Sequence, residues 1–180
     1  LDLIAGLPFE DYESFRRSFN DVYAMEPDQL QLGFLKVLKG SGMREDAPGY
    51  GINWHERAPY EVLTTDWLSY GDVLLLKGVE DMVEVYYNSR QFDRTISKIM
   101  ERYASPFLFF KELADFYDRE GLAGIGHARI ARYEILRRFL SEEKGWELKE
   151  YEQCMVLDLY ARENLKSRPA FAPDLSPYKE

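Results

Sequence analysis

The sequence predicts a mainly α protein in which a helical carboxyl-terminal domain follows a short β-α-β unit. From Ser69 onward, apolar residues recur at helical spacing in successive segments, several of which begin with a capping residue. Before them, two short apolar runs enclose one helical segment, which is the pattern of a strand, a helix and a second strand. The 180 residues suit one ordinary domain, or one domain plus a fragment of another.

The β-α-β unit is expected in residues 1–44. Its first strand lies in LDLIAGLP, an apolar run that glycine and proline end. Its helix lies in EDYESFRRSFNDVYAM, where Tyr12, Phe15 and Phe19 recur at helical spacing, and its second strand lies in QLQLGFLKVLKG. Strands joined by a crossover helix are parallel and right-handed. Because two strands alone do not form a stable sheet, and the chain starts within what reads as a buried strand, we expect a piece cut from a larger protein.

Three regions follow the β-α-β unit. Residues 45–68 are interrupted by glycine and proline but are too apolar for a flexible tether, so we expect an ordered linker. Residues 69–165 form the helical domain, and residues 166–180 form a proline-rich tail that we expect to be loosely held.

Local signals mark the helix ends. SYGD, residues 69–72, resembles a capping box with Asp72 in the usual Glu/Gln place. Ser105 and Pro106 have the types preferred at the N-cap and the first helical position, and Gly121 closes that helix. The glycine-rich GLAGIGH, residues 121–127, follows a helix rather than a strand, so we interpret it as a helix–helix connection and not as a phosphate-binding loop.

Composition narrows the class of protein. The net charge of −9 argues against nucleic acid and anionic membrane surfaces as partners. No apolar run approaches the ~20 residues of a membrane span. The single cysteine, Cys154, excludes a disulfide within the chain and a cluster held by its own cysteines, and it fits a reducing compartment. We therefore expect a cytoplasmic protein.

Most chemically versatile residues are expected to be structural. His55 and His127 are far apart with no third ligand at metal-binding spacing, so a structural or surface role is favoured. Cys154 falls within the apolar pattern of the last helix, where Leu148, Tyr151, Met155, Leu159 and Ala161 also lie, and is expected to be a buried inert thiol. The aromatic residues Phe107, Phe109 and Phe110 are expected in the core.

The strand ends are the exception. Ligands bind at the carboxyl ends of parallel strands, because the amino ends of the following helices converge there. Gly6 would let a ligand approach the backbone, and the next helix start would offer free N–H groups. Gly40 and Ser41, after the second strand, are expected at the same edge.

The segment DLIAGLPFED resembles a late-strand motif of radical SAM enzymes, an apolar strand that ends I-x-G-x-P-G-E. Four residues match the motif: Ile4, Gly6, Pro8 and Glu10. Phe9 stands where that family often has glycine.

Two further segments carry the resemblance. LGFLKVLKGSGM resembles the next strand of that family, and its Gly40–Ser41 is a near match for a Gly-Thr pair. APYEVLTTDWLSYGD, together with YYNSRQF, resembles a carboxyl-terminal extension of unassigned function in radical SAM proteins of the cobalamin-binding type.

The resemblance implies that residues 1–44 are a remnant of a (β/α) barrel. Such a barrel binds S-adenosylmethionine beside a [4Fe-4S] cluster, with cobalamin as a further candidate cofactor of the parent protein. Ile4 and Gly6 would contact the adenine end of S-adenosylmethionine, and Leu35 would form a wall. The cluster cysteines belong to a motif early in the barrel that is absent here, so no cofactor and no activity are expected for the chain alone.

Two functions are therefore expected from different classes. The first is the carboxyl-terminal part of a radical SAM iron–sulfur oxidoreductase, whose partners are the upstream domains of its own chain and a substrate that the sequence does not identify. The second is a helical protein-interaction module without catalysis. An exposed strand edge pairs with other chains, so a homodimer through the first 40 residues is also expected.

Overall fold

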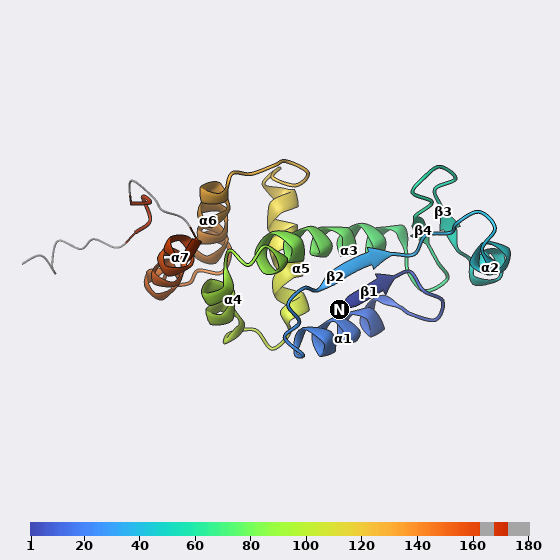
Figure 1. Ribbon diagram of the computed structural model, residues 1–180, viewed down its shortest axis with the longest axis horizontal. Helices are drawn as coiled ribbons and strands as arrows, with labels where there is room; N and C mark the ends of the chain where they lie inside the picture. The colour runs from blue at the N-terminus through green and yellow to red at the C-terminus, as the bar shows by residue number, and fades with distance from the viewer. Residues whose placement is uncertain (163–167, 173–180) are drawn as a thin grey trace, which may run out of the picture.

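The computed structural model describes residues 1–162 and 168–172, and this part of the chain is mainly helical, as predicted (Figure 1). The helices are α1 (Tyr12–Tyr23), α2 (Gly42–Asp46), α3 (Tyr70–Val83), α4 (Asp93–Met100), α5 (Pro106–Arg119), α6 (Arg129–Arg138) and α7 (Lys149–Arg162). The strands are β1 (Asp2–Ala5), β2 (Gln31–Phe34), β3 (Asn53–Trp54) and β4 (Val62–Thr64). None of the described helices is long and apolar enough to cross a membrane.

The amino-terminal part is a parallel β-α-β unit, which confirms the predicted pairing. β1 and β2 run side by side with Ile4 opposite Gly33 and Ala5 opposite Phe34. Asp11 caps α1, because its carboxylate accepts the backbone N–H of Ser14 at 2.8 Å.

The segment between the β-α-β unit and the long helices contains elements that the sequence pattern did not indicate. They are α2, a 3₁₀ turn at Ala47–Tyr50, and the antiparallel pair of β3 and β4. The chain after β2 continues the pairing, since the N–H of Val62 donates to the carbonyl of Leu35 at 2.9 Å and that of Val37 to Tyr60 at 2.8 Å. The segment is therefore fastened to the end of β2.

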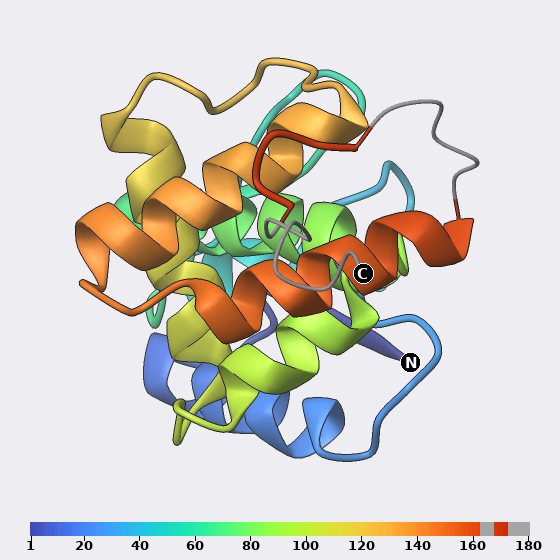
Figure 2. The same cartoon turned by 90° about the vertical axis from the view of Figure 1, so that its left-hand side faces the viewer.

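The helical part begins and turns where its capping residues predict. Ser69 and Asp72 form the expected capping box of α3, and Ser105 caps α5. α3 and α6 each continue into a π-helical turn, at Glu84–Asn88 and Phe139–Glu143. Figure 2 shows α4, α6 and α7 grouped at the end of the molecule opposite to the strand ends.

One aromatic core joins the strands to the helices. Phe107, Phe109 and Phe110 are fully buried, as expected. The ring of Phe19 in α1 lies 5.4 Å from that of Phe107 and 5.9 Å from that of Phe110. The side chain of Asn20 accepts the N–H of Phe107 at 3.0 Å, so α1 also holds the first turn of α5.

Two expectations for the last helix are wrong. Ala161 is exposed and Cys154 is only half-buried, because the buried stripe of α7 runs through Tyr151, Met155 and Asp158 and leaves both beside it. The pKa of the Cys154 thiol is raised, by burial first and then by nearby carboxylates such as Asp158.

The carboxyl-terminal tail is anchored at one described point. Phe171 is buried, and its ring stacks on that of Tyr133 at 5.8 Å, which contradicts a loosely held tail for this residue. The expected end of the last helix, at 163–165, and residues 166–167 and 173–180 of the tail lie outside the described residues.

Candidate functional site

The sheet of β1 and β2 has one packed face and one open face. Leu32 and Phe34 point into the core and are buried. On the other face, Ile4 is 46% exposed and lies opposite Gly33, whose missing side chain leaves space beside it. Leu35, which is half-buried, lies two residues after Gly33 and therefore on the same face. In Figure 1, no described helix lies in front of these two strands.

The structure thus brings two of the three sequence-predicted site residues onto one face. Ile4 and Leu35 both belong to the open face, and the N–H of Leu35 donates to the carbonyl of Ala5 at 2.9 Å, which fixes their spacing. Gly6 lies beyond the end of β1, in the turn toward α1.

Gly6 is glycine for two local reasons. Its φ of +90° is a conformation that side chains rarely adopt, and a Cβ would lie 2.7 Å from Cγ1 of Val62. The side of Gly6 that was expected to admit a ligand is therefore filled by Val62 from β4. A ligand at this point would meet the backbone groups of Gly6.

An aromatic cluster of Phe9, Tyr50 and Trp67 lies at the strand ends. Phe9 is 72% exposed and has a φ of +68°, which is uncommon for a residue with a bulky side chain. Its ring lies 4.7 Å from that of Trp67 and 5.7 Å from that of Tyr50. Strained backbone of this kind concentrates at functional sites. Sequence reasoning did not predict this cluster; the aromatic residue directly after Pro8, in a turn, was the available signal.

The other motif residues at this edge are held by local hydrogen bonds. Glu10 accepts a long hydrogen bond from the hydroxyl of Ser18, 3.5 Å away, and its pKa is raised, mainly by burial. Ser41 caps the short helix α2 and donates its hydroxyl to the carbonyl of Leu38 at 2.8 Å. Ser41 therefore has a structural role in this chain.

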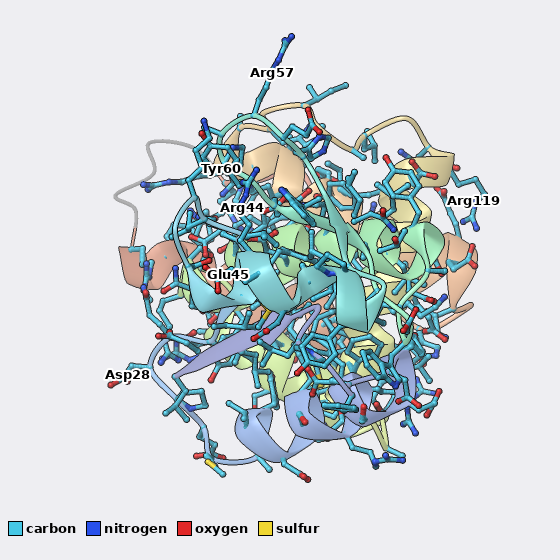
Figure 3. The ribbon with its side chains drawn as sticks, turned by 90° about the vertical axis from the view of Figure 1, so that its right-hand side faces the viewer. Asp28, Arg44, Glu45, Arg57, Tyr60 and Arg119 are labelled. Carbon is cyan, nitrogen blue, oxygen red and sulfur yellow. The ribbon has the colours of Figure 1, made fainter. Side chains whose placement is uncertain are left out.

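Figure 3 views the molecule from the side toward which β1 and β2 run. α2, with Arg44 and Glu45, lies in front, and Tyr60 lies above it. The guanidinium of Arg44 stacks 5.5 Å from the ring centre of Trp54, and Lys39 lies 5.7 Å from that of Tyr60. Cations on this side of the chain are thus placed over aromatic rings.

The histidines do not join this edge into a metal centre. Within the described residues, no group of three or more His, Cys, Asp or Glu side chains could hold a metal ion. His127 lies on another part of the molecule, with Nε2 2.9 Å from the carbonyl oxygen of Leu122. The cluster of Phe9, Tyr50 and Trp67 is aromatic, so its chemistry is to bind an apolar group placed against it and to exclude water from that group.

Comparison with models of protein families gives a match over most of the chain. A family model described as "Protein of unknown function (DUF4080)" matches residues 48–180. No curated protein and no solved structure matches the chain.

Proposed function

The chain belongs to the DUF4080 family of proteins of unknown function, and from that premise we propose that it is the carboxyl-terminal part of a radical SAM iron–sulfur oxidoreductase. In this proposal β1 and β2 contribute to the S-adenosylmethionine site of a cytoplasmic enzyme. The helical region then shapes the substrate side.

The open apolar face of the β1–β2 sheet is the observation that carries the proposal. In a (β/α) barrel, each strand packs one face against helices and turns the other toward the barrel interior. The packed face of β1 and β2 meets the helical core, and the opposite face presents the exposed side chain of Ile4, with Leu35 beside it partly buried against the edge of the core. These two strands have the one-sided packing that a barrel requires.

The backbone at the motif supports the same proposal. Phe9 occupies the position where radical SAM enzymes often have glycine, and its φ of +68° is a conformation that favours glycine. Gly6 has a φ of +90°. The turn after β1 therefore has the backbone conformation that glycines at these motif positions would adopt.

The residues present fit part of an S-adenosylmethionine site. The exposed side chain of Ile4 and the partly exposed Leu35 offer an apolar wall for a planar base, whereas Gly6 would take part through its backbone because Val62 fills the space beside it. S-adenosylmethionine bound beside a reduced [4Fe-4S] cluster supplies one-electron hydrogen-abstraction chemistry. The thiolates for the cluster, and any cobalamin site, are assigned to other parts of the parent protein.

A helical interaction module is the second candidate. Exposed apolar pairs on the helices favour it, since Tyr70 and Leu74 lie one turn apart on α3 and are 52% and 49% exposed. Leu157 and Tyr160 form a similar pair on α7. The exposed side chain of Ile4, and the apolar residues near it at the strands, favour the radical SAM proposal.

The test uses the parent protein, purified without oxygen. It should show [4Fe-4S] absorption and cleave S-adenosylmethionine, and Ile4→Asp should weaken S-adenosylmethionine binding about tenfold, the equivalent of about 1.4 kcal/mol. Leu74→Asp, an equally exposed leucine on α3, is the matched control and should bind normally. A parent protein without cluster absorption, or one in which both variants bind alike, would contradict the proposal.

A further inference from the structure

A cavity of about 330 Å³ lies between α3, α5 and the loop that joins α5 to α6. Gly78 of α3 and Ala114 of α5 line it where the two helices approach closely; a Cβ on Gly78 would lie 3.1 Å from that of Ala114. The loop, residues 121–128, passes along the top of Figure 1 and contains the glycine-rich segment predicted to connect two helices, here α5 and α6. The volume is within the range of small-molecule sites.

The loop is fixed over the cavity by His127. Its Nε2 is 2.9 Å from the carbonyl oxygen of Leu122, and because a carbonyl only accepts, Nε2 carries the proton. The imidazole ring also packs edge-on against Tyr117 at 5.8 Å, and the hydroxyl of Tyr117 is 2.7 Å from that of Tyr86. These contacts connect the loop over the cavity to the buried core.

The lining is mostly apolar but has opposite charges on different walls. Met82, Val85 and Leu122 contribute apolar surface. Asp81 comes from α3 and Arg132 from α6. A site of this kind suits a ligand with an apolar body and few charged groups.

Asp81 and Arg132 line the same cavity without pairing. Among the described residues, neither side chain forms a hydrogen bond or an ion pair, with the other or with any third group. By contrast, Arg137 and Arg138 on the same helix each bond a glutamate, at 2.6 Å to Glu152 and 2.7 Å to Glu120. Two unpaired opposite charges across an apolar cavity can be bridged by a molecule that carries both.

We propose that this cavity binds a small zwitterion of the α-amino acid class with an apolar side chain. Arg132 binds its carboxylate, Asp81 binds its ammonium group, and the apolar side chain lies against Met82 and Val85. Glu84, which also lines the cavity, is held by the amide of Asn88 at 2.9 Å and leaves Asp81 as the free acidic group. This site is separate from the strand-end site and does not depend on it.

The test is calorimetric titration of the full chain with L-leucine as the probe. We expect saturable binding, and at least about tenfold weaker binding of L-leucinamide, which lacks the carboxylate, and of 4-methylpentanoate, which lacks the ammonium group. Arg132→Gln and Asp81→Asn should each weaken L-leucine binding by a similar factor. Arg132→Lys keeps the charge and should retain part of the affinity.

Matched control variants distinguish an effect at the cavity from an effect of the overall charge of the chain. Arg17→Gln and Asp21→Asn make the same changes on exposed positions of α1 and should leave L-leucine binding unchanged. Circular dichroism of each variant checks that it is folded. Absence of saturable binding by the unaltered chain, equal binding of the two single-charge analogues, or folded Arg132 and Asp81 variants with unchanged affinity would overturn the proposal.

Discussion

The helical region and the strand region of this chain differ in how completely they bury their phenylalanine and other apolar side chains. In the helical region, the phenylalanine side chains, such as Phe110 and Phe116, are fully or almost fully enclosed. At the strands, Ile4, Phe9 and Leu38 are 46%, 72% and 50% exposed. The helices enclose an aromatic core and leave scattered apolar residues such as Leu74 and Leu157 exposed, whereas the exposed apolar residues of the strand region lie on and just after β1 and β2, where we propose that further structure covers them.

Core truncation should show the largest difference between the two regions. Phe110→Ala removes a ring that contacts Phe19 and Phe109 in a closed core, and should lower the free energy of unfolding by about 3–5 kcal/mol. Phe9→Ala removes an exposed ring and should cost less than about 1 kcal/mol. Urea unfolding of both variants measures this. Equal losses would show that the strand region is as closed as the helices.

Glycine replacements sharpen the comparison within the strand region. Gly40→Ala meets only the strain of φ +78°, because no atom lies within 4 Å of the added Cβ, and should cost about 1–2 kcal/mol. Gly6→Ala meets similar strain and a contact of 2.7 Å with Val62, so its loss of unfolding free energy should be clearly larger. If thermal unfolding gave the same loss for both, Val62 would not be packed on Gly6 as described.

Acidity should affect the helices through Glu80 on α3. Burial raises its pKa from 4.5, helped by Asp81, Glu61 and Glu84, while Lys77 opposes the change. A raised pKa in the folded state favours folding below the unfolded pKa, and this contribution is lost as the pH rises through the folded pKa.

Glu80→Gln should therefore be more stable than the unaltered chain at neutral pH, by an amount that shrinks as the pH falls through the raised folded-state pKa and is lost below the unfolded value of 4.5. Unfolding free energies across this pH range measure the effect. Asp118→Asn removes one exposed carboxylate of α5 and serves as the control for charge number. A difference that grows toward acid would contradict the assigned direction.

Self-association is the smallest expected effect. The outer edge of β1 has no strand partner among the described residues, so we expect weak, concentration-dependent dimerisation through it. Ile4→Lys should abolish the dimer in sedimentation experiments, and Leu74→Lys on α3 should not. If neither substitution abolished the dimer, or if both did, the contact between the two copies would not lie at β1.

The helices were predictable because their signals are local. Ser69, Asp72 and Ser105 act as caps within a few residues of the helices they start. α2, β3 and β4 are too short to show a period, and β4 is fixed by backbone bonds from Val62 to the distant end of β2. Elements that exist through long-range pairing leave no local pattern in the sequence.

The candidate site also has a part that the local sequence predicts and a part that long-range contacts determine. Ile4 and Gly6 followed from a contiguous motif. The contact of Phe9 with Trp67, and the filling of the space beside Gly6 by Val62, join segments that are far apart in the chain. These contacts, which determine how a ligand could approach, required the structure.

Hydrogen exchange tests the central claim that further structure covers the strand region in the proposed parent protein, whereas the core around α3 and α5 is closed in the chain alone. In the chain alone, we expect the amides of β1 to exchange quickly, while those of α3 and α5 are protected. In the proposed parent protein, the amides of β1 should become protected as well, and those of α3 and α5 should not change. Amides of β1 that are as protected as those of α5 in the chain alone, or that gain nothing in the parent protein, would contradict the account.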